Sequence, residues 1–253
     1  MVRLDGRTAL IAGASSGIGA GFALACAAAG ARVVLAARRA ERCEALAAEI
    51  GASGGQAMGV AMDVMDEATV CAAFDAAETR FGPVDSVVAN AGIGTGGRST
   101  DVSTVGLRQV LDTNLLGTYL VAREGARRMI AAGSRDNGSG RIVLVGSITA
   151  RQSGTGDAMY AASKAGLVHL GRQFAREWVR QGINVNTLEP GWIASEINAA
   201  WFASERGQAD IAALHRRRLL ESGALDDMLV YLLSDRAGQI TGATFTIDDG
   251  QSL

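Results

Sequence analysis

Short apolar runs alternate with longer amphipathic stretches along almost the whole chain. The runs are rich in Val, Ile, Leu and Ala and are predicted to be buried strands, while the stretches between them repeat their apolar residues at helical spacing. The predicted strands are residues 8–12, 31–39, 56–62, 86–89, 141–145, 183–188 and 243–248. The predicted helices are one that ends at residue 29 and the stretches 40–52, 66–81, 104–132, 158–179, 194–220 and 226–233.

This alternation predicts an α/β protein built on a parallel sheet. Each strand is followed by a helix, and such crossovers place helices on both faces of the sheet. The chain has 253 residues, of which 48% are hydrophobic, and it contains no linker or low-complexity tract. We therefore predict a single domain over residues 1–253, with a doubly wound sheet of seven strands and right-handed crossovers.

Charge and cysteine usage argue against several classes of protein. The formal net charge is −2, so neither nucleic acid nor a membrane surface is an expected partner. The N-terminus lacks a signal-peptide core, and no apolar run reaches the length of a membrane span. The three cysteines lack metal-ligand spacing and only two histidines are present, so we expect reduced thiols, no metal site and a cytoplasmic protein.

A glycine-rich turn follows the first predicted strand. Gly13, Gly17 and Gly19 form the pattern GxxxGxG immediately before the first helix, and Ser15 and Ser16 would add hydroxyl donors. Glycine permits close approach of the backbone, and a helix N-terminus offers unpaired N–H groups to a pyrophosphate. In a chain with 33 glycines the pattern alone is weak, but its place between strand and helix predicts a dinucleotide site.

The end of the second strand bears on the choice of cofactor. An acidic side chain there would bind the ribose 2′-hydroxyl of NAD, whereas an arginine accommodates the 2′-phosphate of NADP. Here Ala37 stands where an acid would be expected, and Arg38 and Arg39 follow. Guanidinium groups bind phosphate through paired hydrogen bonds, so we predict NADP rather than NAD. The alternative is that the two arginines only begin an exposed helix.

A serine, a tyrosine and a lysine form the candidate catalytic set. Ser147 follows the strand 141–145, so its hydroxyl is expected at the carboxyl end of that strand. Tyr160 and Lys164 are four residues apart in a predicted helix and project from one face. A cation beside a phenol favours the phenolate, so Lys164 is expected to lower the pKa of Tyr160 from about 10. That would suit Tyr160 to proton transfer near neutral pH, unless YxxxK is only a common helical pair.

These motifs resemble, in the same order, those of the short-chain dehydrogenase/reductase family. The turn 13–19 is similar to the family's TGxxxGIG, with Ala12 in place of the threonine, and Ser163 completes the family's YxxSK. The resemblance covers nearly the whole chain and implies a Rossmann-type fold with strand order 3-2-1-4-5-6-7. Further matching positions are Asp63-Val64, Asn90-Ala91-Gly92 with Ala89 replacing an asparagine, Asn114, and Pro190-Gly191. The alanines at 12 and 89 should weaken local turn bonding rather than chemistry.

The resemblance implies an NADP-dependent alcohol dehydrogenase or carbonyl reductase. In carbonyl reduction NADPH would give a hydride to the carbonyl carbon, while Tyr160 protonates the developing alkoxide and Ser147 holds the same oxygen. Lys164 would also bind the nicotinamide ribose, and Asn114 would hold a water that links Lys164 to solvent. The implied cofactor-binding residues are Gly13, Ser15, Ser16, Gly17, Ile18, Gly19, Arg38, Arg39, Asp63, Val64, Asn90, Ala91, Gly92, Tyr160, Lys164, Pro190, Gly191, Ile193 and Ser195.

Residues 192–222, or about that range, are predicted to form a lid over the substrate. The first part is aromatic in a chain with only 5% aromatic residues, which favours a bulky or apolar ketone, or its secondary alcohol, over a sugar. The alternative is that these residues pack the lid onto the body or form a subunit contact. Candidate substrate contacts are Ile148, Gln152, Met159, Trp192, Ile197, Trp201 and Phe202, with the loop 93–97. The HRRR run at 215–218 is expected to be a solvated helix face rather than a phosphate site, but it could still meet an acidic carrier, which keeps reduction of a 3-oxoacyl-carrier-protein open.

Three functions remain open at this point. The leading one is an NADP-dependent oxidoreductase for a ketone and its secondary alcohol, and the second is a 3-oxoacyl-(acyl-carrier-protein) reductase. The third is a non-catalytic dinucleotide-sensing module, which should have lost part of the catalytic set that this chain retains. By analogy the family also implies a homotetramer, or a homodimer, with the last strand and the helices 104–132 and 158–179 as contact surfaces.

Overall fold

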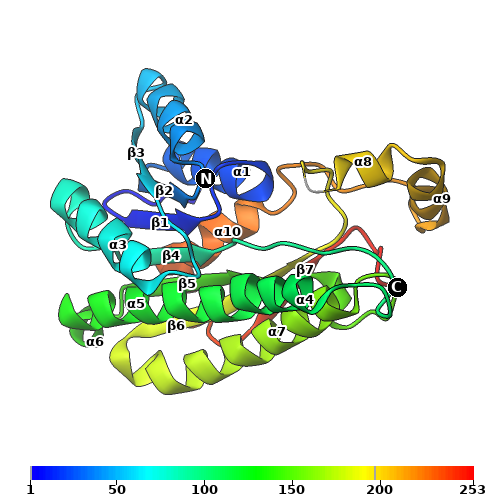
Figure 1. The fold of residues 1–253 in the computed structure, drawn as a ribbon. Coiled ribbons are helices and arrows are strands. Elements are labelled where there is room, and N and C mark those ends of the chain that lie inside the picture. Colours follow the sequence, from blue (N-terminus) through cyan, green and yellow to red (C-terminus); the bar gives the residue numbers. More distant parts are fainter. Residues whose placement is uncertain (1, 197) are drawn as a thin grey trace.

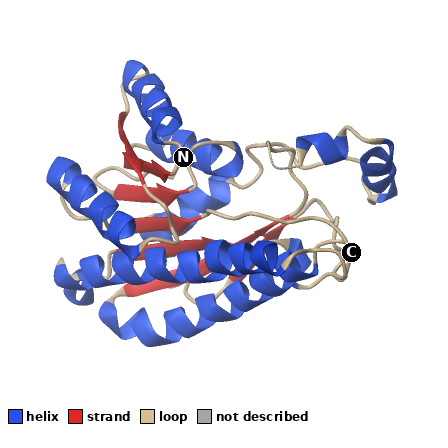
Figure 2. Ribbon diagram, viewed as in Figure 1, coloured by secondary structure: helices blue, strands red, loops and turns tan. Residues whose placement is uncertain are grey.

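All the candidate turns lie on one side of the sheet, at the carboxyl ends of its strands. In the computed structural model, which describes residues 2–196 and 198–253, seven parallel strands lie in the order β3-β2-β1-β4-β5-β6-β7 (Figures 1 and 2). The predicted doubly wound α/β fold and its strand order are confirmed. The strands are β1 (Thr8–Ala12), β2 (Arg32–Ala37), β3 (Gln56–Ala61), β4 (Ser86–Ala89), β5 (Gly140–Val145), β6 (Ile183–Pro190) and β7 (Thr244–Ile247).

Helices cover both faces of the sheet because successive strand residues point to opposite sides. Ile11 of β1 packs in one core cluster with Phe22, whereas its neighbour Leu10 packs in a second cluster with Phe74. The first cluster includes α1 (Gly17–Ala28), α2 (Ala40–Ala52) and α10 (Asp226–Leu233), and the second includes α3 (Glu67–Phe81), α5 (Thr118–Ala131) and α7 (Ala158–Trp178). The smaller elements are α4 (Thr104–Leu111), η1 (Asp112–Gly117), α6 (Ser134–Asn137), η2 (Ile148–Ala150), η3 (Val179–Gln181), α8 (Ala199–Phe202), α9 (Glu205–Ala213) and η4 (Asp235–Ala237).

Two predicted helices differ from the observed ones. The stretch 104–132 is helical from Thr104 to Ala131, but its middle, η1, is a π-helix of six residues. The stretch 194–220 is not one helix, because the chain turns at Ser204, whose side chain accepts a hydrogen bond from the N–H of Gly207. The α8 and α9 helices consequently form a short projecting hairpin (Figure 1). Residues 215–218 lie in a turn, so the expectation that they form a helix face is wrong.

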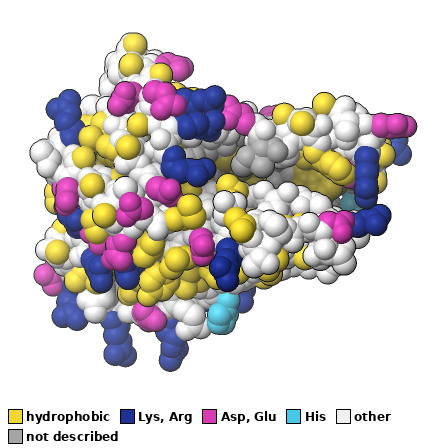
Figure 3. Space-filling view, in the orientation of Figure 1, with side chains coloured by type: hydrophobic (Ala, Val, Ile, Leu, Met, Phe, Trp, Pro, Cys, Tyr) yellow, Lys and Arg dark blue, Asp and Glu magenta, His cyan; other side chains and the backbone are white. Residues whose placement is uncertain are grey.

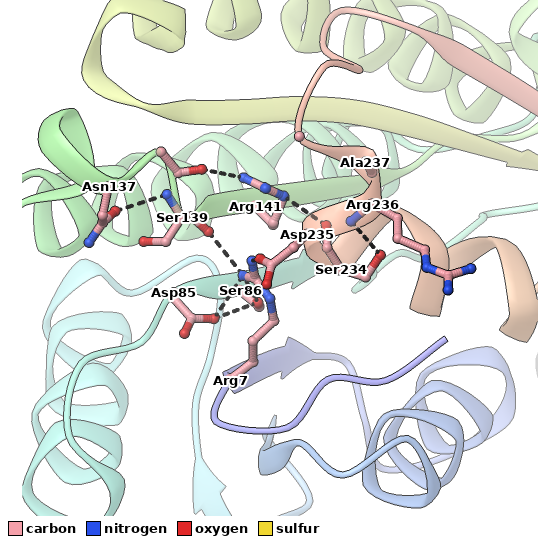
Figure 4. Close-up of polar contacts among 12 residues, drawn as sticks. Arg7, Asp85, Ser86, Asn137, Ser139, Arg141, Ser234, Asp235, Arg236 and Ala237 are labelled. Atoms are coloured by element: carbon pink, nitrogen blue, oxygen red, sulfur yellow. Dashed lines mark hydrogen bonds and ion pairs between the residues drawn. The ribbon is translucent and has the colours of Figure 1, made fainter. Parts of the chain in front are cut away.

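The amino edge of the sheet is held by a polar cluster (Figure 4). Arg7, which is 7% exposed, donates to the carbonyl of Ser139 at 2.9 Å and pairs with Asp85 at 3.3 Å and with Asp235. Arg141, 3% exposed, donates to the carbonyls of residues 138, 140 and 234. Buried charges are stable only when paired in this way, so the cluster ties β1, β4 and β5 to the end of α10. It lies at the sheet edge opposite the candidate site.

Candidate active site

Ser147, Tyr160 and Lys164 meet at the carboxyl end of β5. Ser147 comes two residues after the strand. Its hydroxyl accepts a hydrogen bond from the Thr149 hydroxyl at 2.9 Å, and it lies close enough to the Tyr160 side chain to favour the phenolate form. Lys164 Nζ lies 5.6 Å from the centroid of the Tyr160 ring and donates to the carbonyl oxygen of Val145 at 2.7 Å. The strand end and the first two turns of α7 therefore bring the predicted set together.

The electrostatics of this set differ from the expectation. The pKa of Tyr160 is raised above its usual value, chiefly because burial disfavours the phenolate; the hydrogen bond from Ser147 opposes this rise and the nearby carboxylate of Asp157 adds to it. Burial also lowers the pKa of Lys164 to about 8. The prediction that Lys164 lowers the pKa of Tyr160 is therefore wrong. The ammonium is directed to the Val145 carbonyl, and the cost of removing water dominates.

Asn114 ties the loop after β4 to α7. It is fully buried in the π-helical segment η1, and its Oδ1 accepts from the N–H of Ile93 at 2.8 Å. Its Nδ2 donates to the Ile93 carbonyl at 2.9 Å and to Ser163 Oγ at 3.0 Å. Ser163 in turn donates to the Tyr160 carbonyl at 2.7 Å. Asn114 thus fixes the backbone beside Tyr160, and π-helical turns of this kind occur frequently at functional sites.

The glycines of this turn allow neighbouring backbone segments of the protein to pack closely against one another. A Cβ at Gly19 would lie 2.2 Å from the Gly13 carbonyl oxygen, and one at Gly13 would lie 2.8 Å from Ala91 Cα. Asn90 Nδ2 reaches the Gly13 carbonyl at 3.2 Å and so joins the turn to the end of β4. Ser16 is the N-cap of α1 but makes no side-chain capping bond, which leaves N–H groups of the first turn available to a ligand.

Of the two candidate arginines, Arg39 is the one that lies across this turn. Its Nη2 donates to Ser15 Oγ at 3.0 Å and to Ser16 Oγ at 2.8 Å. The Arg38 side chain, from the same strand end, is exposed to solvent. The sequence alone could not show which of Arg38 and Arg39 contacts the turn, because the two residues differ only in the direction in which each side chain points from the end of the strand.

The remaining predicted cofactor residues lie along the same carboxyl edge. A Cβ at Gly92 would come within 3.4 Å of Asn114 Oδ1 and 3.5 Å of Lys164 Nζ. Asp63 follows β3 and accepts a hydrogen bond from the N–H of Met65 at 3.0 Å, and buried Val64 packs against Gly117. The others follow β4 (Ala91), begin α1 (Gly17, Ile18), end β6 (Pro190) or follow β6 (Gly191, Ile193 and Ser195). The edge is thus continuous from β3 to β6.

Comparison with known proteins agrees with this arrangement. The family model described as short chain dehydrogenase matches residues 7–206. The chain belongs to this family. Its members are oxidoreductases that use a nicotinamide dinucleotide. No metal-binding group of three or more His, Cys, Asp or Glu side chains, and no helix with the length and hydrophobicity of a membrane span, occurs in the described part of the chain.

Relatives of this short chain dehydrogenase carry different substrate names. D-threitol dehydrogenase of Mycolicibacterium smegmatis is 36% identical over 251 residues, covering 99% of this chain and 95% of the relative. The 3-oxoacyl-(acyl-carrier-protein) reductase of Escherichia coli is 30% identical over the full length of both chains. The crystal structure of a gluconate 5-dehydrogenase from Burkholderia cenocepacia in complex with NADP and tartrate matches with a TM-score of 0.92 and 31% identity, covering 99% of this chain and 97% of that one.

The predicted lid aromatics contact one another rather than forming a wide pocket. The rings of Trp192 and Phe202 lie 5.9 Å apart, Phe202 is buried, and Trp201 is 44% exposed. In Figure 3 the surface is hollowed beneath the projecting lid, and hydrophobic atoms are visible there. These contacts agree with the alternative that the aromatics pack the lid. Ile197 lies outside the described residues.

The other predicted substrate contacts are mixed in character. Ile148 is buried, and Gln152 donates to the carbonyl of Gln251 at 3.2 Å. Met159 lines a cavity of about 110 Å³ with Asp157 and residues of the loop 95–102. The cavity combines hydroxyl, carboxylate and aliphatic groups, so it gives no specific support to an apolar substrate.

Sequence reasoning missed two acidic residues beside the set. Asp157 stands three residues before Tyr160, and its buried Oδ1 has no hydrogen-bond partner in the described part of the chain. Glu189, fully buried near the end of β6, pairs with Arg151 and accepts from the Thr246 hydroxyl at 3.1 Å. The only signal for Glu189 was that it is the single charged residue of the strand 183–190. For Asp157, the signal was its place directly before the helix that carries Tyr160.

Proposed function

We propose that this short chain dehydrogenase interconverts a ketone and a secondary alcohol with NADP(H), and that Tyr160 is its proton donor and acceptor. The observation that carries the proposal is the convergence of the Ser147 and Tyr160 side chains at the carboxyl end of β5, with the Lys164 ammonium one helical turn away. All three stand at the sheet edge that also holds the glycine-rich turn. A carbonyl oxygen held here would lie beside its proton donor, Tyr160.

The raised pKa of Tyr160 suits it to donate a proton. At neutral pH the phenol stays protonated, so it can give its proton to an alkoxide as that charge develops. Ser147 holds the same oxygen through its hydroxyl, which Thr149 orients from the other side. The reverse reaction needs the phenolate, so alcohol oxidation is expected to accelerate with rising pH.

Lys164 and Asn114 would organise the site around this proton transfer. Lys164 is largely protonated at neutral pH, since its pKa is about 8, and it can bind ribose hydroxyls through the N–H groups that Val145 does not occupy. Asn114 holds the loop at Ile93 and the serine of the YxxSK motif. A water between Asn114 and Lys164, as the family resemblance implies, stays a prediction.

The donor set of the nucleotide end fits a pyrophosphate and a 2′-phosphate. The start of α1, whose N-cap Ser16 makes no side-chain capping bond, suits the first group. Arg39 with Ser15 and Ser16 suits the second, and Arg38 is the second candidate contact. When bound, NADP(H) supplies or accepts the hydride. A solved relative with NADP lends further support, and residues 192–222 would cover the substrate within one domain.

The substrate is best decided by a panel read at the nicotinamide absorbance with both cofactors. The predicted bulky or apolar ketones are set against the polyol and sugar-acid substrates suggested by the names of two relatives. An acyl thioester arm tests the 3-oxoacyl reductase, which the Escherichia coli relative favours. The homotetramer and the cytoplasmic location stay predictions, the first of which a sedimentation measurement would decide.

A Tyr160→Phe variant tests the chemical role directly. Turnover should fall by about 10²–10⁴-fold, the usual contribution of general acid catalysis, while NADP binding persists. Tyr119→Phe is the matched control, because Tyr119 is 39% exposed on α5 and its ring lies beside that of Phe174, with 5.3 Å between the ring centroids, rather than beside Ser147 or Lys164. Turnover of Tyr160→Phe within tenfold of the wild type would refute the role given to Tyr160.

A further inference from the structure

A carboxylate of the lid, that of Glu196, forms ion pairs with two arginines that follow β2. Glu196 Oε2 pairs with Arg39 Nη1 at 3.0 Å, and its Oε1 pairs with Arg42 Nη1 at 2.6 Å. Through its Nη2 the same Arg39 guanidinium donates to Ser15 and Ser16. One arginine therefore spans the glycine-rich turn and the lid. Arg42, one turn into α2, was not predicted from the sequence as part of this site.

The contact brings the lid against the nucleotide end. A Cβ built at Gly17 would lie 3.5 Å from Ser195 Cβ, so the residue before Glu196 also lies against the turn. Hydrogen bonds from Arg42 and then Arg39 lower the pKa of Glu196, so its carboxylate is charged at neutral pH. All three side chains of the ion pairs are about half exposed. Such pairs contribute little free energy and are easily exchanged for a stronger anion.

A 2′-phosphate would need the groups that Glu196 now holds. Two guanidinium groups beside two serine hydroxyls form a donor set suited to a phosphate monoester, which carries close to two negative charges at neutral pH. An N–H group that donates to Glu196 cannot also donate fully to the phosphate. A carboxylate left in place would repel the phosphate directly. The ribose hydroxyl of NAD makes no such demand, because it carries no charge.

We infer that Glu196 is a specificity-determining residue that competes with the 2′-phosphate of NADP for Arg39 and Arg42, so that NADP, and not NAD, releases the lid from the nucleotide end. This inference rests on the proposed function only for the place of the 2′-phosphate. It adds Arg42 to the phosphate contacts. It also makes lid position depend on which nucleotide arrives.

The test uses fragments that separate the phosphate from the rest of the cofactor. Adenosine 2′,5′-bisphosphate and 5′-AMP are titrated calorimetrically into the full-length protein, followed by NADP⁺ and NAD⁺. In Glu196→Gln, which keeps the shape and removes the charge, affinity for the bisphosphate and NADP⁺ should rise by about 3–10-fold, as expected for exposed ion pairs. Affinity for 5′-AMP and NAD⁺ should not change. Arg42→Gln should weaken only the 2′-phosphorylated ligands.

A control and a second signal complete the test. Glu205→Gln removes the same charge from an exposed position at the start of α9 and should leave all four affinities unchanged. Two of the three tryptophans, Trp192 and Trp201, lie in the lid, so their fluorescence should change with the bisphosphate and not with 5′-AMP.

Each outcome bears on a separate claim. Equal effects of Glu196→Gln on both ligand classes, or no effect, would overturn the inference and leave the NADP preference standing. A wild type that binds NAD⁺ more tightly, with Glu196→Gln shifting it towards NADP⁺, would support the competition and refute the proposed preference for NADP.

Discussion

The buried ammonium of Lys164 should make the stability of this enzyme depend on pH in a predictable direction. Lys164 is 3% exposed, has no carboxylate among its described hydrogen-bond partners, and has a pKa lowered by burial from 10.5 to about 8. That fall corresponds to a cost of about 3 kcal/mol for keeping the charged form in the folded protein. Between pH 8 and 10.5 the unfolded chain binds more protons at this site than the folded chain. The contribution of Lys164 to stability therefore increases as the pH rises through this window.

A Lys164→Met variant isolates this contribution. Free energies of unfolding are measured in urea without cofactor at a series of pH values from 7 to 9.5, and the wild type is compared with the variant at each pH. The wild type should gain about 2 kcal/mol relative to the variant between pH 7 and pH 9.5, and the difference should be flat below pH 7. The lost hydrogen bond to Val145 shifts the difference by a constant amount and does not alter its trend.

The chain offers an independent check, because Lys164 is its only lysine. Protein made with ¹³C-lysine should give a single side-chain signal, whose titration reads the pKa of Lys164 directly. A midpoint above 10, together with an unfolding difference that does not change with pH, would refute the argument that burial controls this group. It would also restore the expectation that a fully charged lysine acts on Tyr160 across the working pH range.

Three further variants test other parts of the structure. Asp157→Asn removes a carboxylate that raises the pKa of Tyr160, so the alkaline limb of the pH profile for alcohol oxidation should move to lower pH; an unchanged limb contradicts the assignment. Gly19→Ala would place a Cβ 2.2 Å from the Gly13 carbonyl oxygen and should abolish NADP binding in a titration. The control is Gly51→Ala, because Gly51 in α2 has open space around it. That substitution should leave the free energy of unfolding unchanged or raise it by up to about 1 kcal/mol. Arg7→Ala should lower the free energy of unfolding by about 2–4 kcal/mol, because it removes the partner of Asp85. The value of kcat/KM should stay close to that of the wild type, because this ion pair lies at the amino ends of the strands, away from the candidate active site. A large loss of kcat/KM in folded protein would contradict that separation.

The sequence predicts the sheet well because its strands are buried on both faces. The runs 8–12 and 86–89 coincide with β1 and β4. The lid is predicted less well. Helical periodicity over 194–220 does not reveal that the Ser204 side chain caps a new helix or that Gly207 packs close to the Trp201 carbonyl, since neither interaction involves the apolar residues that make up the periodic pattern.

The site shows a similar limit. The four-residue spacing of Tyr160 and Lys164 correctly places both on one face of α7, but spacing contains no information about the water that remains around them. Burial decides the direction of both pKa changes, and it depends on the whole fold. The ion pairs of Glu196 likewise join residues more than 150 positions apart in the chain, which no local pattern connects.

The π-helical segment that carries Asn114 has a consequence for insertions and deletions. The extra residue of a π-helical turn rotates the residues that follow it by roughly 100° about the helix axis, compared with a uniform α-helix. The helix before residue 112 and the helix after residue 117 therefore present different faces to the sheet. Deleting a single residue there would leave the helix continuous and equally apolar, yet it would turn the side-chain amide of Asn114 away from Ile93. The number of residues in this segment therefore matters to the active site as much as the identity of Asn114 does.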